Sequence, residues 1–114
     1  MRYFSQEMNR FCKKLQLFNT KYANPHGLMN KVNKSTTNDQ ARLSAIAMED
    51  KLFREVVGCK KYSCSIISKS GNQKTMNWVN TNKLLKMKEC LGIKTGFTSS
   101  AGPCLSSYFN LIDK

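Results

Sequence analysis

The sequence predicts an α+β fold in which helices come first and an antiparallel sheet follows. In the first half of the chain, apolar residues recur every three to four positions, which is typical of amphipathic helices. After Gly58 the period changes to two, because apolar and polar residues alternate as they do in strands. A chain of 114 residues is long enough for one domain and too short for two.

A helix is predicted at the N-terminal end of the chain. Its apolar stripe consists of Phe4, Met8, Phe11 and Leu15. Cys12 lies on the same side and is predicted to belong to the core. Because Ser5 comes too late to cap the whole pattern, the sequence favours a polypeptide that once continued upstream.

Turn residues separate this helix from two further helices. Pro25 and Gly27 predict a turn over residues 24–28, in which His26 is interpreted as a hydrogen-bonded element and not as a catalytic residue. Thr36 and Asp39 have the spacing of a capping box, which predicts the start of a helix that continues through residues 41–48. The last predicted helix covers residues 52–57 and ends at Gly58.

The second half of the chain is predicted to hold a hairpin, a short helical turn and two more strands. The hairpin strands are residues 62–67 and 75–79, and Ser70-Gly71-Asn72 forms the turn between them. Asn80-Thr81-Asn82 is expected to cap a short helical turn. The remaining strands are residues 91–98 and 104–109.

Composition limits the possible partners. The formal net charge of +12 indicates an anionic partner or a lysine-rich solvated surface. The lysine clusters are short and do not interleave with aromatic residues, so we do not expect nucleic-acid binding.

The cysteines and the single histidine limit the possible sites. Because the five cysteines show no C-x-x-C spacing and there is one histidine, the sequence predicts neither a metal site nor a cofactor. Free thiols favour a reducing compartment. No stretch approaches the ~20 apolar residues of a membrane span, and no signal peptide is visible.

Lys94, Thr95 and Gly96 stand in a row near the C-terminus and are the candidate binding residues. A lysine ammonium and a threonine hydroxyl suit an anion, and glycine lets another backbone or a carboxylate approach closely. The tripeptide Lys-Thr-Gly occurs by chance in many proteins, so it indicates a function only when the neighbouring segments point to the same one. Five other segments have to be considered together with these three residues. They are Asn24-Pro25-His26-Gly27-Leu28, Ser35-Thr36, residues 52–57, residues 80–85 and residues 101–105.

Together these segments resemble the C-terminal half of the catalytic domain of D-alanyl-D-alanine carboxypeptidases, the low-molecular-mass penicillin-binding proteins of peptidase family S11. The resemblance implies a partial β-lactamase/transpeptidase-like fold, with residues 1–114 as a single partial domain. It also implies that Lys94 and Thr95 meet the terminal carboxylate of a D-Ala-D-Ala peptide. Gly96 would let the peptide lie along the strand, and the backbone N–H of Phe97 would serve the oxyanion hole.

The nucleophile of that family is missing from this chain. No serine from Ser5 to Ser107 is followed by a lysine at the third position, so no catalytic residue is assigned. Ser70-Gly71-Asn72 has the Ser-x-Asn form, but it lies close before Lys94, whereas the family motif would fall before Met1. We therefore expect a chain that is inactive alone and that folds poorly in isolation, with an exposed apolar face.

Two other functions stay open from the sequence. One is a non-catalytic module that binds a peptide carboxylate or a protein on a remnant of the fold, and the other is a nucleic-acid-binding protein, which is supported by charge alone. The expected partners are a peptide with a free C-terminal carboxylate and an upstream half-domain. The compartment also stays open, because the family works outside the cytoplasm while the cysteines of this chain favour a reducing one.

Overall fold

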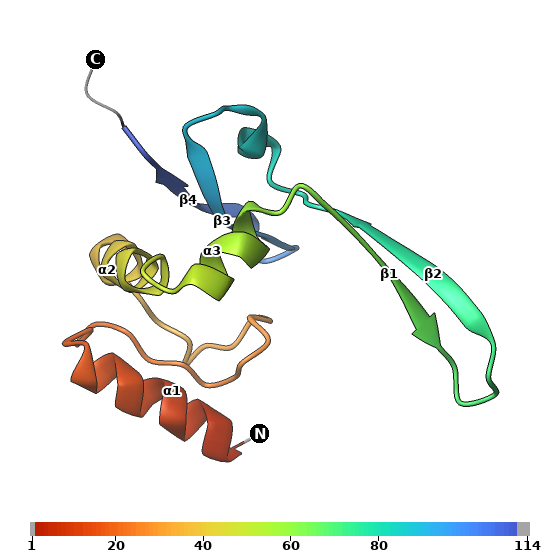
Figure 1. Ribbon diagram of the computed structural model, residues 1–114. Coiled ribbons are helices and arrows are strands. Elements are labelled where there is room, and N and C mark those ends of the chain that lie inside the picture. The colour runs from red at the N-terminus through yellow and green to blue at the C-terminus, as the bar shows by residue number, and fades with distance from the viewer. Residues whose placement is uncertain (1, 112–114) are drawn as a thin grey trace.

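The computed structural model describes residues 2–111, with helices in the first half of the chain and strands in the second (Figure 1). The elements in chain order are α1 (Arg2–Lys14), α2 (Thr37–Ala47), α3 (Lys51–Gly58), β1 (Lys61–Ile67), β2 (Gln73–Val79), the 3-10 helix η1 (Lys83–Lys86), β3 (Cys90–Thr98) and β4 (Gly102–Phe109). The predicted α+β class and the order of its elements are confirmed. Within residues 2–111, none of the helices is long and apolar enough to cross a membrane.

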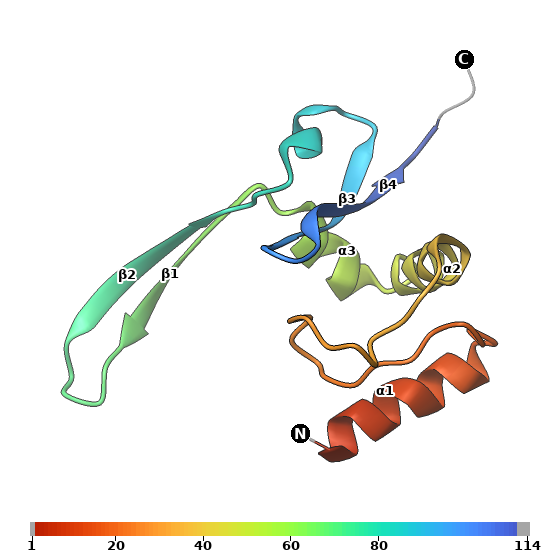
Figure 2. The same cartoon turned by 180° about the vertical axis from the view of Figure 1, so that it is seen from behind.

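The strands form two antiparallel sheets of two strands each, where the sequence predicted one sheet. β1 pairs with β2 and extends away from the rest of the chain as an arm, whereas β3 pairs with β4 close to α2 and α3 (Figures 1 and 2). The prediction of one sheet is corrected: residues 80–89, which include η1, separate the two hairpins along the chain, and the hairpins run in different directions (Figures 1 and 2). Alternation of residue types identifies strands but does not say which strands share a sheet.

Polar contacts hold α1 against the chain that follows it. The Asn9 side chain accepts a hydrogen bond from the Tyr22 N–H (2.8 Å) and donates one to the Tyr22 carbonyl (2.7 Å). At the other end of α1, the Arg42 guanidinium of α2 donates to the carbonyls of Leu15 and Gln16, each at 3.3 Å. The two bonds from Arg42 satisfy carbonyl groups that directly follow the C-terminus of α1, where the helix provides no partner.

The apolar core is small and leaves much of the α1 stripe uncovered. The buried apolar side chains of the described residues are Cys12, Leu17, Met48, Leu85 and Cys90. The prediction for Cys12 is confirmed, whereas Phe4 and Phe11 are 61% and 54% exposed. An amphipathic helix normally buries its stripe. Phe4 and Phe11 thus leave part of the stripe of α1 open to solvent.

A buried carboxylate fixes the start of α2. The Thr36 hydroxyl oxygen accepts from the Asp39 N–H (3.2 Å), which confirms Thr36 as the N-cap. The Asp39 carboxylate does not turn back to complete a capping box but accepts from the Asn19 N–H (3.0 Å) and the Thr20 hydroxyl (2.7 Å). Asp39 is only 3% exposed. Such a group is held inside by the hydrogen bonds that it accepts.

Replacing Asp39 with alanine should lower the free energy of unfolding by about 2–4 kcal/mol, because the Asn19 N–H and the Thr20 hydroxyl would lose a charged acceptor. Asp50 is the matched control, since it caps α3 at the surface through the Phe53 N–H (2.7 Å). Asp50→Ala should cost about 1 kcal/mol. Urea unfolding of both variants measures the difference, and equal losses would contradict the role assigned to Asp39.

The buried thiol of Cys12 gives a pH-dependent prediction. Burial raises the pKa of Cys12 above its ordinary value, and the negative charge of Asp39 raises this pKa further. The protonated thiol therefore contributes stability that is complete below the ordinary thiol pKa and is lost as the pH rises through the raised value. Iodoacetamide should modify Cys12 more slowly than the exposed Cys104 across the range of about pH 7–10. Mass spectrometry of the alkylated peptides measures both rates, and equal rates would refute the shift.

Candidate functional site

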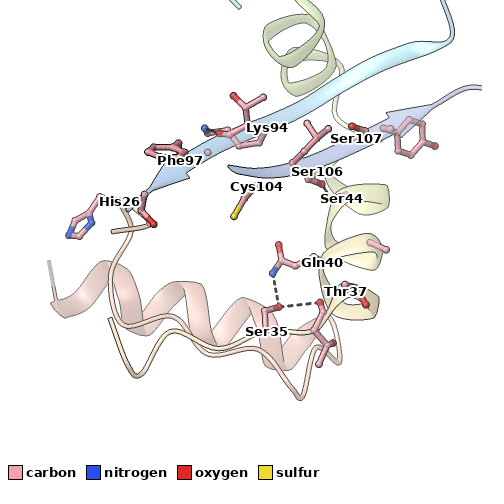
Figure 3. A pocket seen from close by; sticks show the side chains of 18 of the residues that line it. His26, Ser35, Thr37, Gln40, Ser44, Lys94, Phe97, Cys104, Ser106 and Ser107 are labelled. Atoms are coloured by element: carbon pink, nitrogen blue, oxygen red, sulfur yellow. Dashed lines mark hydrogen bonds between the residues drawn. The ribbon is translucent and has the colours of Figure 1, made fainter. Parts of the chain in front are cut away.

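A cleft of about 1160 Å³ opens between the helical half of the chain and the β3–β4 hairpin. Its walls are α2 and the turn at residues 26–28 on one side, and β3 and β4 on the other (Figure 3). Hydroxyl groups dominate its polar lining. They belong to Ser35, Thr36, Thr37, Ser44, Thr95, Thr98, Ser106, Ser107 and Tyr108. A surface of this kind offers many hydrogen-bond donors and acceptors but little fixed charge.

The four residues singled out by the sequence all lie on β3 and line this cleft: Lys94, Thr95, Gly96 and Phe97. The Lys94 side chain is exposed, and its ammonium donates to the carbonyl of Thr95. Neither of the two ion pairs found among the described residues includes Lys94. The cleft therefore has one ammonium group that no carboxylate of residues 2–111 neutralises within ion-pair distance.

A contact from outside the hairpin restrains Thr95. Its hydroxyl oxygen lies 2.5 Å from that of Thr81, at hydrogen-bond distance. Thr81 directly precedes Asn82, which caps η1 by accepting from the Leu84 N–H (3.1 Å). The sequence predicted that residues 80–82 would cap a helical turn, which is confirmed, but it gave no sign that Thr81 reaches Thr95.

Two glycines of β3 have different roles. Gly92 has a φ of +152°, and a Cβ placed there would lie 2.7 Å from a methyl carbon of Val57 in α3. The packing of β3 on α3 therefore requires glycine at this position. A Cβ at Gly96 would meet no atom within 4 Å. Packing inside the described chain thus gives no reason for glycine at position 96, which leaves room for an approach from outside.

Further cleft residues were missed by the sequence because no local motif marks them. The hydroxyl oxygens of Ser44 in α2 and Ser106 in β4 lie 3.2 Å apart and join the two walls. Cys104, which pairs with Gly96 across the hairpin, points into the cleft toward Gln40 (Figure 3). Gln40 is itself held by donating to Ser35 (2.7 Å).

His26 lies at one end of the cleft (Figure 3), and its interpretation as a turn element is confirmed. Its Nδ1 accepts from the Leu28 N–H (3.2 Å), and the Asn24 side chain accepts from the Gly27 N–H (3.0 Å). The imidazole of His26 therefore stabilises the turn through a hydrogen bond.

Ser70-Gly71-Asn72 lies at the far end of the β1–β2 hairpin and not at the cleft. The Asn72 N–H donates to the Ser68 hydroxyl (3.1 Å), and Gly71 has a φ of +81°. The interpretation of this segment as a turn is confirmed. Among residues 2–111, no three His, Cys, Asp or Glu side chains gather in a group that could hold a metal ion.

Comparison with known sequences gives the cleft a family context. The sequence profile of the D-alanyl-D-alanine carboxypeptidase family matches residues 1–108. The D-alanyl-D-alanine carboxypeptidase of Streptomyces sp. (strain K15) is 36% identical over 104 residues, which cover 90% of this chain and 36% of that protein. D-alanyl-D-alanine carboxypeptidase DacF of Bacillus subtilis (strain 168) is 30% identical over 105 residues, which cover 91% of this chain and 26% of that protein.

Solved structures agree with the sequence comparison. The crystal structure of the Streptomyces K15 DD-transpeptidase matches with a TM-score of 0.88 at 34% identity, covering 95% of this chain and 42% of that one. A D-alanyl-D-alanine carboxypeptidase from Mycobacterium tuberculosis H37Rv matches in fold, with a TM-score of 0.71 at 22% identity. The chain thus spans about a third of the length of the K15 relative and less than half of its solved structure.

The contrast between the two glycines can be measured. Gly92→Ala should lower the free energy of unfolding by at least about 2 kcal/mol, because the new methyl group meets Val57 and the backbone is strained. Gly96→Ala should change it by less than about 0.5 kcal/mol. Urea unfolding of the two variants tests the difference. A loss at position 96 as large as that at position 92 would show that the fold itself needs this glycine.

Proposed function

The chain belongs to the D-alanyl-D-alanine carboxypeptidase family, and from this premise we propose that residues 1–114 are a partial catalytic domain that forms the carboxylate-binding wall of a D-Ala-D-Ala peptide site. One observation carries the proposal. Lys94, Thr95 and Gly96 line the cleft side by side, with Lys94 unpaired by any carboxylate and Gly96 unexplained by packing among residues 2–111.

The chemistry of β3 fits the end of a peptide. The Lys94 ammonium and the Thr95 hydroxyl are donors to the terminal carboxylate, and bonds to a charged acceptor are stronger than neutral ones. The contact with Thr81 limits the rotation of the Thr95 hydroxyl group. A peptide backbone lies along β3 as an added strand, because the absent Cβ of Gly96 leaves it room. The backbone N–H of Phe97 is the donor for the oxyanion of the scissile carbonyl.

Acyl transfer requires a nucleophile that residues 1–114 do not contain. In the family reaction, a serine oxygen bonds to the peptide carbonyl carbon, and the terminal D-alanine leaves as its amide bond breaks. We propose that the Ser-x-x-Lys segment belongs to an upstream half-domain equivalent to a part of the K15 relative that this chain does not span. The exposed Phe4 and Phe11 of α1 suit packing against such a polypeptide.

A second function is compatible with the absence of a Ser-x-x-Lys motif from residues 1–114. The Lys-Thr-Gly strand without a Ser-x-x-Lys serine fits a module that binds peptide carboxylates and does not cleave them. Both functions predict binding of the same ligand. They differ in whether a complementary half-domain restores acylation.

The chain should bind an N-acetylated peptide that ends in D-Ala-D-Ala, with chemical-shift changes at the amides of residues 94–97 in an NMR titration. Lys94→Gln should raise the Kd about three- to tenfold, because one charge-assisted contact is lost. Lys31→Gln removes an exposed lysine that does not line the cleft and should leave the Kd unchanged. Equal binding of the same peptide with an amidated C-terminus would refute recognition of the carboxylate.

The same chain should not be acylated by a fluorescent β-lactam, since it has no Ser-x-x-Lys serine. A covalent label on any of its serines would overturn the assignment of the nucleophile to another segment. Addition of a polypeptide that covers the missing part of the K15 catalytic domain separates the two functions. Acylation of the mixture supports the partial catalytic domain, and unchanged peptide binding without acylation supports the module.

A further inference from the structure

The hairpin of β1 and β2 has an exposed apolar face that carries its two aromatic residues. Its register and the alternation of strand side chains place three cross-strand pairs on this face: Tyr62 with Trp78, Cys64 with Met76, and Ile66 with Lys74. The exposed fractions of Tyr62, Ile66 and Trp78 are 60%, 46% and 48%. The other face is mixed: Ser63 donates to the Asn77 side chain (2.6 Å) and Ser65 pairs with Thr75, while Ile67 and Val79 lie at its ends and are 76% and 68% exposed.

The hairpin is held at its base and reaches away from the cleft. The Asn80 side chain donates to the carbonyls of Val57 (3.3 Å) and Cys59 (3.0 Å), and the Asn80 N–H donates to the carbonyl of Lys60 (2.9 Å). Figures 1 and 2 show the two strands extending past all three helices. The apolar face is therefore presented on an arm whose base is fixed to the end of α3.

The charged residues of the hairpin and of the segment that follows it are all positive. Between Glu55 and Glu89 the sequence has no acidic residue. It has seven lysines in this interval: Lys60, Lys61, Lys69, Lys74, Lys83, Lys86 and Lys88. The first four belong to the hairpin or its immediate start. The arm thus combines an apolar, aromatic face with lysines whose uncompensated charge favours an anionic partner.

We infer that the β1–β2 hairpin docks this protein on the surface of a membrane rich in anionic phospholipids. Tyrosine and tryptophan side chains prefer the boundary between headgroups and acyl chains, since each has an apolar ring and a polar group. Ile66 and Met76 extend the apolar surface that enters this boundary. The lysines place their stems along it and their ammonium groups against the lipid phosphates.

Charge complementarity alone would also admit a nucleic acid, but the aromatic pair favours lipid. The rings of Tyr62 and Trp78 stack on each other, with centroids 6.0 Å apart, so each ring already has an aromatic neighbour and is less available as a platform for bases. Cys64, Ile66 and Met76 prolong an apolar surface that base stacking does not need. The inference is independent of the proposed peptide site, because it concerns the β1–β2 hairpin, which does not line the cleft, and a different ligand.

Trp78 is the only tryptophan of the chain, so its fluorescence reports on this face directly. Vesicles of equal parts phosphatidylglycerol and phosphatidylcholine should shift its emission to the blue and protect it from acrylamide. Vesicles of phosphatidylcholine alone should do neither at physiological ionic strength. Co-sedimentation with the same vesicles measures the partition coefficient of the full chain.

Two sets of variants separate the hairpin from the general charge of the protein. Replacement of Lys60, Lys61, Lys69 and Lys74 by glutamine should lower partitioning into the anionic vesicles at least about tenfold, since each lysine near such a surface contributes on the order of fivefold. The charge-matched control replaces four exposed lysines elsewhere by glutamine: Lys13, Lys21, Lys31 and Lys34. It should lower partitioning less than about threefold. Ile66→Ser, which keeps every charge, should weaken partitioning and reduce the blue shift.

Three results would overturn the inference. The first is an equal loss in the two lysine variants, which would show attraction by net charge alone. The second is sedimentation with vesicles while Trp78 stays as accessible to acrylamide as in buffer, which would place the contact elsewhere. The third is a change in Trp78 emission with a single-stranded oligothymidylate but not with anionic vesicles, which would make nucleic acid the partner.

Discussion

The fold of the helical half depends on the buried carboxylate of Asp39. A carboxylate in this position must keep its hydrogen-bond donors, because burying it without them is costly. The donors are the Asn19 N–H and the Thr20 hydroxyl, and the Thr20 oxygen lies a further 2.8 Å from that of Ser35. The loop that follows α1 is thereby fixed to the start of α2. The turn at residues 26–28, which belongs to that loop, can then stand opposite β3 and form a wall of the cleft.

The opposite wall is fixed by packing instead of charge. Gly92 lets β3 lie directly on Val57 of α3, where a Cβ on residue 92 would come within 2.7 Å of the valine and no side chain has room. The bond between Ser44 and Ser106 joins α2 to β4. Both walls are thus set by contacts that use neither the side chain of Lys94 nor a side chain at position 96. The edge of β3 can therefore carry an exposed ammonium and a bare backbone without contributing to stability, which is what a binding edge requires.

Much of this arrangement could be predicted from the sequence, because periodicity, caps and turns are local signals. Local signals of this type predicted the Thr36 cap and the turns at Gly27 and Gly71. They also placed residues 94–96 in a strand. What could not be predicted depends on contacts between distant residues. The partners of Asp39 lie about twenty positions upstream, and Ser44 and Ser106 are 62 positions apart. The division of the strands into two sheets has the same origin, since pairing energy depends on tertiary placement and not on alternation alone.

The two exposed apolar surfaces differ in the charge around them, and this difference decides what each can contact. Beside the stripe of α1, Glu7 and Arg10 form an ion pair of 2.7 Å, so charges of both signs border Phe4 and Phe11. A border of mixed sign matches a polypeptide surface, which also carries both signs. The hairpin has lysines and no acidic residue, so a mixed surface would leave its charge only partly compensated. Its charge favours a surface that is uniformly negative and large compared with the arm. A half-domain on α1 and a lipid surface on the hairpin would thus occupy separate faces, and the lipid surface would leave the edge of β3 open to the peptide and to the serine that the half-domain supplies.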